Sequence, residues 1–138
     1  MNAMNTIVIR TVRPDDLAQT AAVEAACFPA AEAADERSLR ERIAAFPESF
    51  LVAETEGRVI GFINGAVTDQ RTITDDMFED AGLHNPDGAY QSIFGLDVVE
   101  EFRRQGIAAQ LMEAMIRRAR EQGRRGLILT CKDRLIGY

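Results

Sequence analysis

Apolar residues in the first half of the chain recur with two different periods, which predict both strands and helices. Leu39, Ile43 and Phe46 fall at helical spacing, so they share one side of a predicted amphipathic helix. The glycine-containing segment Thr55-Glu56-Gly57 separates two strand-like runs and favours a hairpin turn. The predicted order is a strand at 7–12, a helix from about residue 14 to 27, a helix from about residue 35 to 46, and hairpin strands at 50–54 and 58–67.

The pattern in the second half predicts a long polar loop, then a strand, a helix and another strand. The loop, residues 68–89, is acidic, is expected to hold a short helix near Met77, and is long enough to be functional or mobile. The strand at 91–99 contains Gly95, which predicts a bulge or a close approach by another backbone. The last two elements are an amphipathic helix at about 108–122 and a mostly apolar run at 126–130, typical of a buried parallel strand.

The length and the composition of the chain predict a single domain with one hydrophobic core. With 138 residues, 46% of them hydrophobic and 28% charged, the sequence is close to the average of globular proteins. Its formal charge of −6 argues against nucleic acid or an anionic membrane as a partner, because clustered Lys and Arg drive binding to either. The first residues lack the features of a signal peptide and no long apolar run follows, which predicts a cytoplasmic protein.

Cysteine and histidine are too few for the commonest metal and hydrolase sites. Two cysteines, Cys27 and Cys131, and one histidine, His84, cannot supply the four ligands of a His/Cys zinc site, so no metal is expected. A Ser-His-Asp hydrolase is disfavoured, because His84 has a loop-like context and the sequence contains no nucleophile elbow.

The segment between the strand at 91–99 and the following helix has the features of an anion-binding loop. It contains Arg103, Arg104 and Gly106, and it enters the helix through small residues. Backbone N–H groups at such a helix N-terminus converge on a phosphate with little obstruction from side chains. The segment is neither a Walker A motif nor a three-glycine dinucleotide fingerprint. An unrelated phosphate-binding α/β domain is therefore one open alternative.

The run Arg103-Arg104-Gln105-Gly106-Ile107-Ala108 resembles the Arg/Gln-x-x-Gly-x-Gly/Ala signature of the GNAT superfamily of N-acetyltransferases. The resemblance covers nearly the whole chain, because the predicted elements follow the family's order. Short matches at 46–49, 56–63 and 129–133 are most similar to the arylalkylamine branch. The resemblance implies a mixed α/β fold, in which helices flank a central mixed sheet with a splayed parallel strand pair. This single domain would span residues 6–138 and lack the family's usual C-terminal strands.

The resemblance further implies an acetyl-CoA-dependent N-acetyltransferase that transfers the acetyl group directly to a primary amine of a small molecule. The diphosphate would lie on the loop, and the pantetheine arm would pair with the free backbone edge at Leu96 and Val98. An amide near Leu96 would polarise the thioester carbonyl. The implied cofactor-binding residues are Leu96, Val98, Arg103, Arg104, Gln105, Gly106, Ile107, Ala108 and Ala109.

Two departures from the family pattern bear on catalysis. The arylalkylamine branch carries two histidines on this strand, and Ser92 and Phe94 stand in their places, so no imidazole base is available there. The amine must arrive neutral, or lose its proton through Tyr90, Ser92 and water, or through an acid of the long loop. The chain also stops before the family's usual C-terminal segment, whose tyrosine protonates the leaving thiolate. Tyr138 lies next to that position and is either a substitute or a terminal core residue.

These departures leave a second class of function open, a CoA-binding module that is catalytically inactive or impaired. The short C-terminus also leaves one edge of the predicted strand at 126–130 exposed. Because exposed strand edges pair with other chains, we expect either a homodimer or a form less stable and less active than an extended one.

Overall fold

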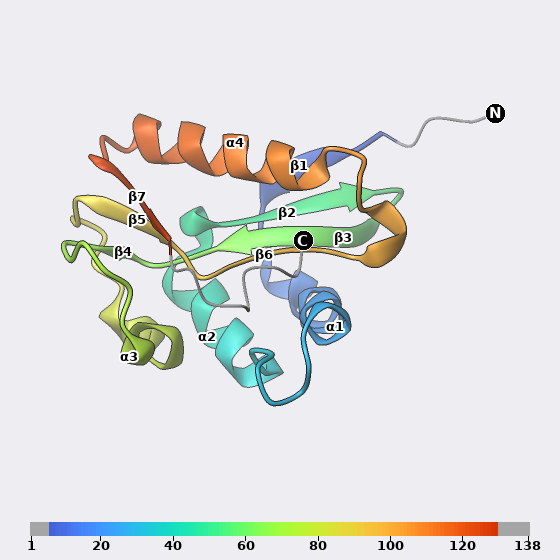
Figure 1. The fold of residues 1–138 in the computed structure, drawn as a ribbon, viewed down its shortest axis with the longest axis horizontal. Helices are drawn as coiled ribbons and strands as arrows, with labels where there is room; N and C mark the ends of the chain where they lie inside the picture. Colours follow the sequence, from blue (N-terminus) through green and yellow to red (C-terminus); the bar gives the residue numbers. More distant parts are fainter. Residues whose placement is uncertain (1–5, 130–138) are drawn as a thin grey trace.

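Two sheets form the centre of the molecule in the computed structural model, which describes residues 6–129 (Figure 1). The first sheet is antiparallel and has the order β1 (Val8–Thr11), β2 (Phe50–Thr55), β3 (Arg58–Asn64), β6 (Gly95–Val98). The second has the order β4 (Val67–Thr68), β5 (Tyr90–Ile93), β7 (Gly126–Leu129), and β5 and β7 run parallel. The predicted mixed α/β architecture is confirmed.

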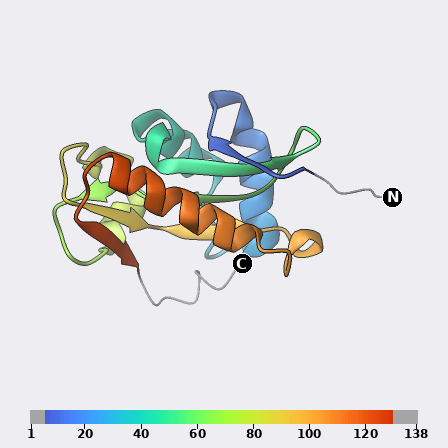
Figure 2. The same cartoon turned by 90° about the horizontal axis from the view of Figure 1, so that it is seen from above.

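Helices cover both faces of the first sheet. The helices are α1 (Leu17–Cys27), α2 (Glu36–Ala45), α3 (Asp75–Glu79) and α4 (Ile107–Glu121). Helices α1 and α2 pack together on one face and α4 covers the other (Figure 1), and Figure 2 shows α4 from above, lying over β6. The short α3 lies in the polar loop near Met77, as predicted. No helix among residues 6–129 is long and apolar enough to cross a membrane.

The predicted hairpin is confirmed, but its second strand ends earlier than expected. Glu56 and Gly57 have φ angles of 51° and 80°, the left-handed pair that a tight hairpin turn requires. After Asn64 the chain leaves the first sheet, and Val67 pairs with β5 in the second one. Gly65 lies at this crossing, where a Cβ would overlap the carbonyl oxygen of Ser92. The close approach of two backbones therefore ends β3 and makes glycine necessary at residue 65.

The strand predicted at 91–99 is in fact two strands that belong to different sheets. β5 pairs in parallel with β7, whereas β6 pairs antiparallel with β3. The break is at Phe94, next to the glycine for which an irregularity was predicted. Because the chain bends here, β5 pairs with β7 in the second sheet and β6 pairs with β3 in the first. The parallel pairing of β5 and β7 is confirmed, and the splaying of the parallel pair stays a prediction.

The apolar side of α4 faces the core as predicted, but β7 is less buried than expected. Leu111 and Met115 have no exposed surface. By contrast, Leu129 is 56% exposed, because β7 is at the edge of its sheet among the described residues. The prediction that this strand is buried was therefore wrong, whereas its parallel pairing is confirmed. A homodimer through this edge stays a prediction.

Candidate functional site

One edge of β6 has no strand partner among residues 6–129, since β6 pairs only with β3. The amide of Val99 donates to the carbonyl of Ile60, with 2.9 Å between nitrogen and oxygen. In an antiparallel ladder, successive residues turn their amides to opposite edges. The amides of Leu96 and Val98 therefore face the open edge, next to the start of the loop that leads to α4.

The loop between β6 and α4 presents backbone N–H groups on a concave surface. Arg104 has a φ of 67°, and Gly106, the N-cap of α4, has a φ of 81°. Left-handed residues in such a loop turn neighbouring N–H groups to one side and form a nest for anions. The positive end of the α4 dipole lies at the same place. A Cβ built on Gly106 would have no atom within 4 Å, so the space before it is open.

A hollow of about 370 Å³ lies beside this loop, and we call it the loop hollow. Seven of the nine residues predicted to bind the cofactor line it, and Leu96 and Gln105 do not. Leu96 belongs to the site through its amide at the strand edge, whereas Gln105 is exposed. The lining residues are Val98, Phe102, Arg103, Arg104, Gly106, Ile107, Ala108 and Ala109.

Arg103 holds a position that the sequence did not predict. Its Nε donates to the carbonyl oxygen of Val98 at 2.8 Å, and its Nη2 lies 3.7 Å from Cys27 Sγ. The Cys27 thiol also lies within 3.5 Å of the Val98 carbonyl. The prediction of a free backbone edge therefore needs a correction, because the carbonyl of Val98 already accepts from Arg103. The exposed Arg104 is left at the lip of the loop hollow.

Glu101, an acidic residue just before the loop, has its negative charge compensated by an arginine. Arg58 Nη2 lies 2.7 Å from Glu101 Oε1, and this hydrogen bond holds the pKa of the Glu101 carboxyl below its ordinary value. The Arg58 guanidinium also lies 5.7 Å from the ring centroid of Phe102. Arg58 thus neutralises one carboxylate beside a loop that is suited to an anion.

Of the predicted catalytic residues that the structure describes, neither Tyr90 nor Ser92 lines the loop hollow. Ser92 has no exposed surface, and its amide and its hydroxyl both donate to the carbonyl of Ala66. Tyr90 is half-buried and begins β5 opposite Gly126. Tyr138 lies outside the described residues, as does Cys131. The catalytic roles of Tyr90, Ser92 and Tyr138 stay predictions.

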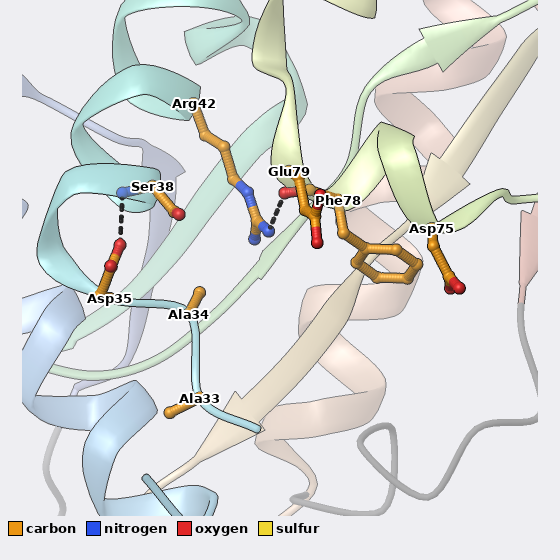
Figure 3. A pocket seen from close by; sticks show the side chains of 8 residues that line it. All are labelled: Ala33, Ala34, Asp35, Ser38, Arg42, Asp75, Phe78 and Glu79. Atoms are coloured by element: carbon orange, nitrogen blue, oxygen red, sulfur yellow. Dashed lines mark hydrogen bonds between the residues drawn. The ribbon is translucent and has the colours of Figure 1, made fainter. Parts of the chain in front are cut away.

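A second cavity, of about 330 Å³, lies near the opposite end of β6, and we call it the α2–α3 cavity (Figure 3). The buried Arg42 donates from Nη2 to the carbonyl of Phe78 at 3.0 Å, and its guanidinium carbon lies 5.0 Å from the ring centroid of Phe94. Arg42 thus links the cavity to Phe94, the residue between β5 and β6. Its lining residues are Ala33, Ala34, Asp35, Ser38, Arg42, Asp75, Phe78 and Glu79.

The sequence contained two signals for this region that the prediction did not use. Arg42 falls at helical spacing among Leu39, Ile43 and Phe46, so the charge had to lie on the buried side of α2. Asp97 interrupts the apolar run of β6 and has no exposed surface. A charged residue on an otherwise apolar face indicates either a buried polar network or a functional site.

Asp97 is held against a second carboxyl, that of Glu24 on α1. Burial raises the pKa of Asp97 well above its ordinary value, and the contact with Glu24 raises it further. Glu24 is only 5% exposed, and its Oε2 accepts from the amide of Ala34 at 2.8 Å. Since Ala34 lines the α2–α3 cavity, Glu24 is hydrogen-bonded to a residue of the cavity wall.

Comparisons with known proteins point in the same direction as this geometry. The family model described as "Acetyltransferase (GNAT) family" matches residues 17–135. A curated protein of Bacillus subtilis (strain 168), "Probable hydrolase YhcX", is 30% identical in a comparison over 132 residues that covers 89% of this chain and 25% of that protein. The chain therefore spans about a quarter of that relative.

Two solved structures share the fold. The "GphF GNAT-like decarboxylase in complex with isobutyryl-CoA" has a TM-score of 0.74 and 30% identity, with 82% of this chain and 59% of that chain covered. Diaminobutyrate acetyltransferase EctA from Paenibacillus lautus, solved with L-2,4-diaminobutyric acid and coenzyme A, has a TM-score of 0.60 and 17% identity, with 82% and 58% covered. The second likeness is evidence of fold alone.

Proposed function

Because the chain belongs to the GNAT family of acetyltransferases, we propose that it transfers an acetyl group from acetyl-CoA directly to a primary amine of a small molecule. The observation that carries this proposal is the open edge of β6, which leads into the left-handed loop at Gly106. One continuous surface thus offers backbone amides for an extended chain and a nest for a diphosphate. The arylalkylamine branch stays a prediction.

The dimensions of this surface support an acyl-CoA ligand. The four residues of β6 span about 13 Å, so an extended arm anchored in the loop hollow would reach the break at Phe94. Its amide groups would pair with the backbone at Leu96 and Val98 in the manner of an added strand. Acetyl-CoA would supply the thioester, whose carbonyl carbon is the electrophile of the reaction.

The α2–α3 cavity is suited to hold the acceptor amine. Its Arg42 contacts Phe94, the residue at which the arm would end. Asp35, Asp75 and Glu79 surround it with carboxylates. Carboxylates attract a protonated amine and align it for attack.

Within this arrangement each group of the chain has a limited task. The Leu96 amide would donate to the thioester oxygen, on which negative charge grows as nitrogen attacks. A protonated amine has no free electron pair, so it would first lose one proton, through Tyr90 and Ser92 with water or to an acid of the polar loop. As the C–N bond forms and the C–S bond breaks, the nitrogen would release a second proton to water, and the thiolate would take one up from Tyr138 or water.

Thiol release from acetyl-CoA in the presence of an amine panel is the experiment that tests this function. The panel contains monoamines, diamines, an amino sugar and an amino acid, and reactions without amine are the control. We expect release that requires an amine and saturates with it. Calorimetric titration of CoA runs in parallel, so that binding and turnover are measured separately.

Two outcomes would contradict the proposal. CoA binding without amine-dependent release would favour the inactive CoA-binding module. Amine-independent loss of CO₂ from a carboxylated acyl-CoA would favour the chemistry named for the GphF neighbour.

We predict different effects for the two neighbouring arginines of the loop. Arg104→Ala removes an exposed charge at the lip of the loop hollow and should weaken CoA binding about tenfold, less so at high salt. Arg103→Ala removes one of the two side chains that donate to the carbonyl of Val98, the other being Cys27, and should change binding with little dependence on salt, since the Arg103 side chain is bonded to the protein. Calorimetry across ionic strength measures both. Arg117→Ala, at an exposed position of α4, is the control and should change nothing; equal salt slopes for Arg104→Ala and wild type would refute the lip assignment.

A further inference from the structure

Asp97 and Glu24 form a buried pair of carboxyl groups between β6 and the two helices that cover it. The Asp97 side chain has no exposed surface and Glu24 is 5% exposed. Neither oxygen of Asp97 has a hydrogen-bond donor among the N–H and hydroxyl groups of the described residues. An ionised carboxylate without donors is very costly at such a place, so the group has to be neutral or has to find a donor.

Protonation of Asp97 resolves this conflict. A neutral carboxyl carries one O–H donor, and the carboxylate of Glu24 is the acceptor in contact with it. Glu24 is satisfied from its other side, because its Oε2 accepts from the Ala34 amide. The remaining charged and titratable groups that act on Asp97 are Cys27 from α1 and Arg42 from α2.

We propose that Asp97 is protonated and donates to Glu24, and that Glu24 thereby holds Ala34 and the wall of the α2–α3 cavity in the position that binds the acceptor. Asp97 is a positioning residue in this scheme, since it touches neither the cofactor edge nor the cavity. The amides of Leu96 and Val98 point away from β3, toward the edge proposed for CoA, and the two carboxyl groups do not contact that edge. We therefore expect CoA binding to be independent of the Asp97–Glu24 pair. The part of the proposal that concerns the acceptor rests on the function proposed above.

The proposal predicts a split between two steady-state parameters. Asp97→Asn keeps a neutral donor toward Glu24 and should leave KM for the amine within about twofold of wild type. Asp97→Ala leaves Glu24 charged, buried and without its donor, and should raise KM for the amine at least fivefold while the Kd for CoA stays unchanged. Equal KM values for the two variants would overturn the positioning role.

The protonation state is tested on the wild-type protein, independently of any activity. The ¹³C resonance of the Asp97 carboxyl carbon, assigned by its absence in Asp97→Asn, should report the neutral acid at pH 7. A carboxylate signal at pH 7 would overturn the proposal.

The pH dependence of the free energy of unfolding tests the direction of the Asp97 pKa shift. Because the pKa of Asp97 is higher in the folded than in the unfolded protein, wild type should lose stability as the pH rises above about 4 toward the folded pKa. Asp97→Asn should not show this loss, and parallel pH profiles for the two proteins would overturn the proposal.

Failure of this proposal is distinguishable from failure of the proposed function. If no amine is acetylated, hydrogen exchange of the Ala34 amide still reads out the coupling, since Asp97→Ala should accelerate it and Asp97→Asn should not. Such a result would support the pair and count against the transferase activity alone. Unaltered exchange in Asp97→Ala would overturn the coupling whether or not the protein is active.

Discussion

Replacing Gly106 by Glu is expected to abolish CoA binding and leave the protein folded. Gly106 has a φ of 81° and faces open space in front of the loop hollow. Glu at this position places a carboxylate where the diphosphate is expected and covers the N–H groups of the nest. A loss of at least a hundredfold in affinity, about 3 kcal/mol, is therefore expected in a calorimetric titration with CoA.

The opposite end of the same helix offers a matched control. Gly123 follows α4, has a φ of 78° and, like Gly106, has no atom within 4 Å of a Cβ built on it. Gly123→Glu therefore carries the same left-handed penalty of about 1 kcal/mol but lies a helix length from the loop hollow. It should bind CoA like wild type. If Gly106→Glu also keeps its affinity, the loop is not the diphosphate site.

Gly65→Ala is expected to be the most destabilising small substitution at a described glycine. The new methyl group would overlap the carbonyl oxygen of Ser92, which belongs to the backbone and cannot rotate away. The glycine is fixed on both sides, because its amide donates to Ser49 at 3.2 Å and its carbonyl accepts from Gln91 Nε2 at 2.7 Å. Relief requires the two sheets to separate, so we expect a loss of about 3 kcal/mol or more in urea denaturation.

Gly126→Ala is the corresponding control for this substitution. A Cβ on Gly126 in β7 would lie 3.9 Å from Tyr90 Cδ1, an ordinary packing distance. Its free energy of unfolding should stay within about 1 kcal/mol of wild type. If Gly65→Ala were as stable as this control, the two backbones at the crossing between the sheets could move apart with no loss of free energy of unfolding, and the prediction would be wrong.

The sequence alone predicted the helices that have one apolar and one polar side, and the tight turn that contains glycine. The stripe of α4 at Leu111 and Met115 and the turn at Glu56-Gly57 needed only local information, and both are confirmed. An irregularity at Gly95 was predicted, but the division of residues 91–99 between two sheets was not, because the sequence does not show which strand each half pairs with. Only the pairing of β5 with β7 and of β6 with β3 separates the two strands.

The candidate site also has a part that the sequence predicted and a part that it did not. The loop hollow was predicted because its residues are contiguous and carry a family signature. The α2–α3 cavity was missed because Asp35 and Arg42 of the α2 segment and Glu79 of α3 are far apart in the sequence, and only the fold brings the two segments together. The bond from Arg103 to Val98 was also missed, since a sequence indicates that an arginine is charged and does not indicate which oxygen it reaches.

Because residues 90–98 are divided between two sheets, we expect the pairing within the two sheets to form at different stages of folding. Only two residues separate β2 from β3 in the sequence, whereas β6 and the whole of α4 lie between β5 and β7. Loop closure costs more entropy as the intervening chain lengthens, so the hairpin is expected to form early and the parallel pair late. Mild denaturant should then detach β7 while the hairpin still protects its amides, and the region beside the open strand edge would be the first to lose its structure.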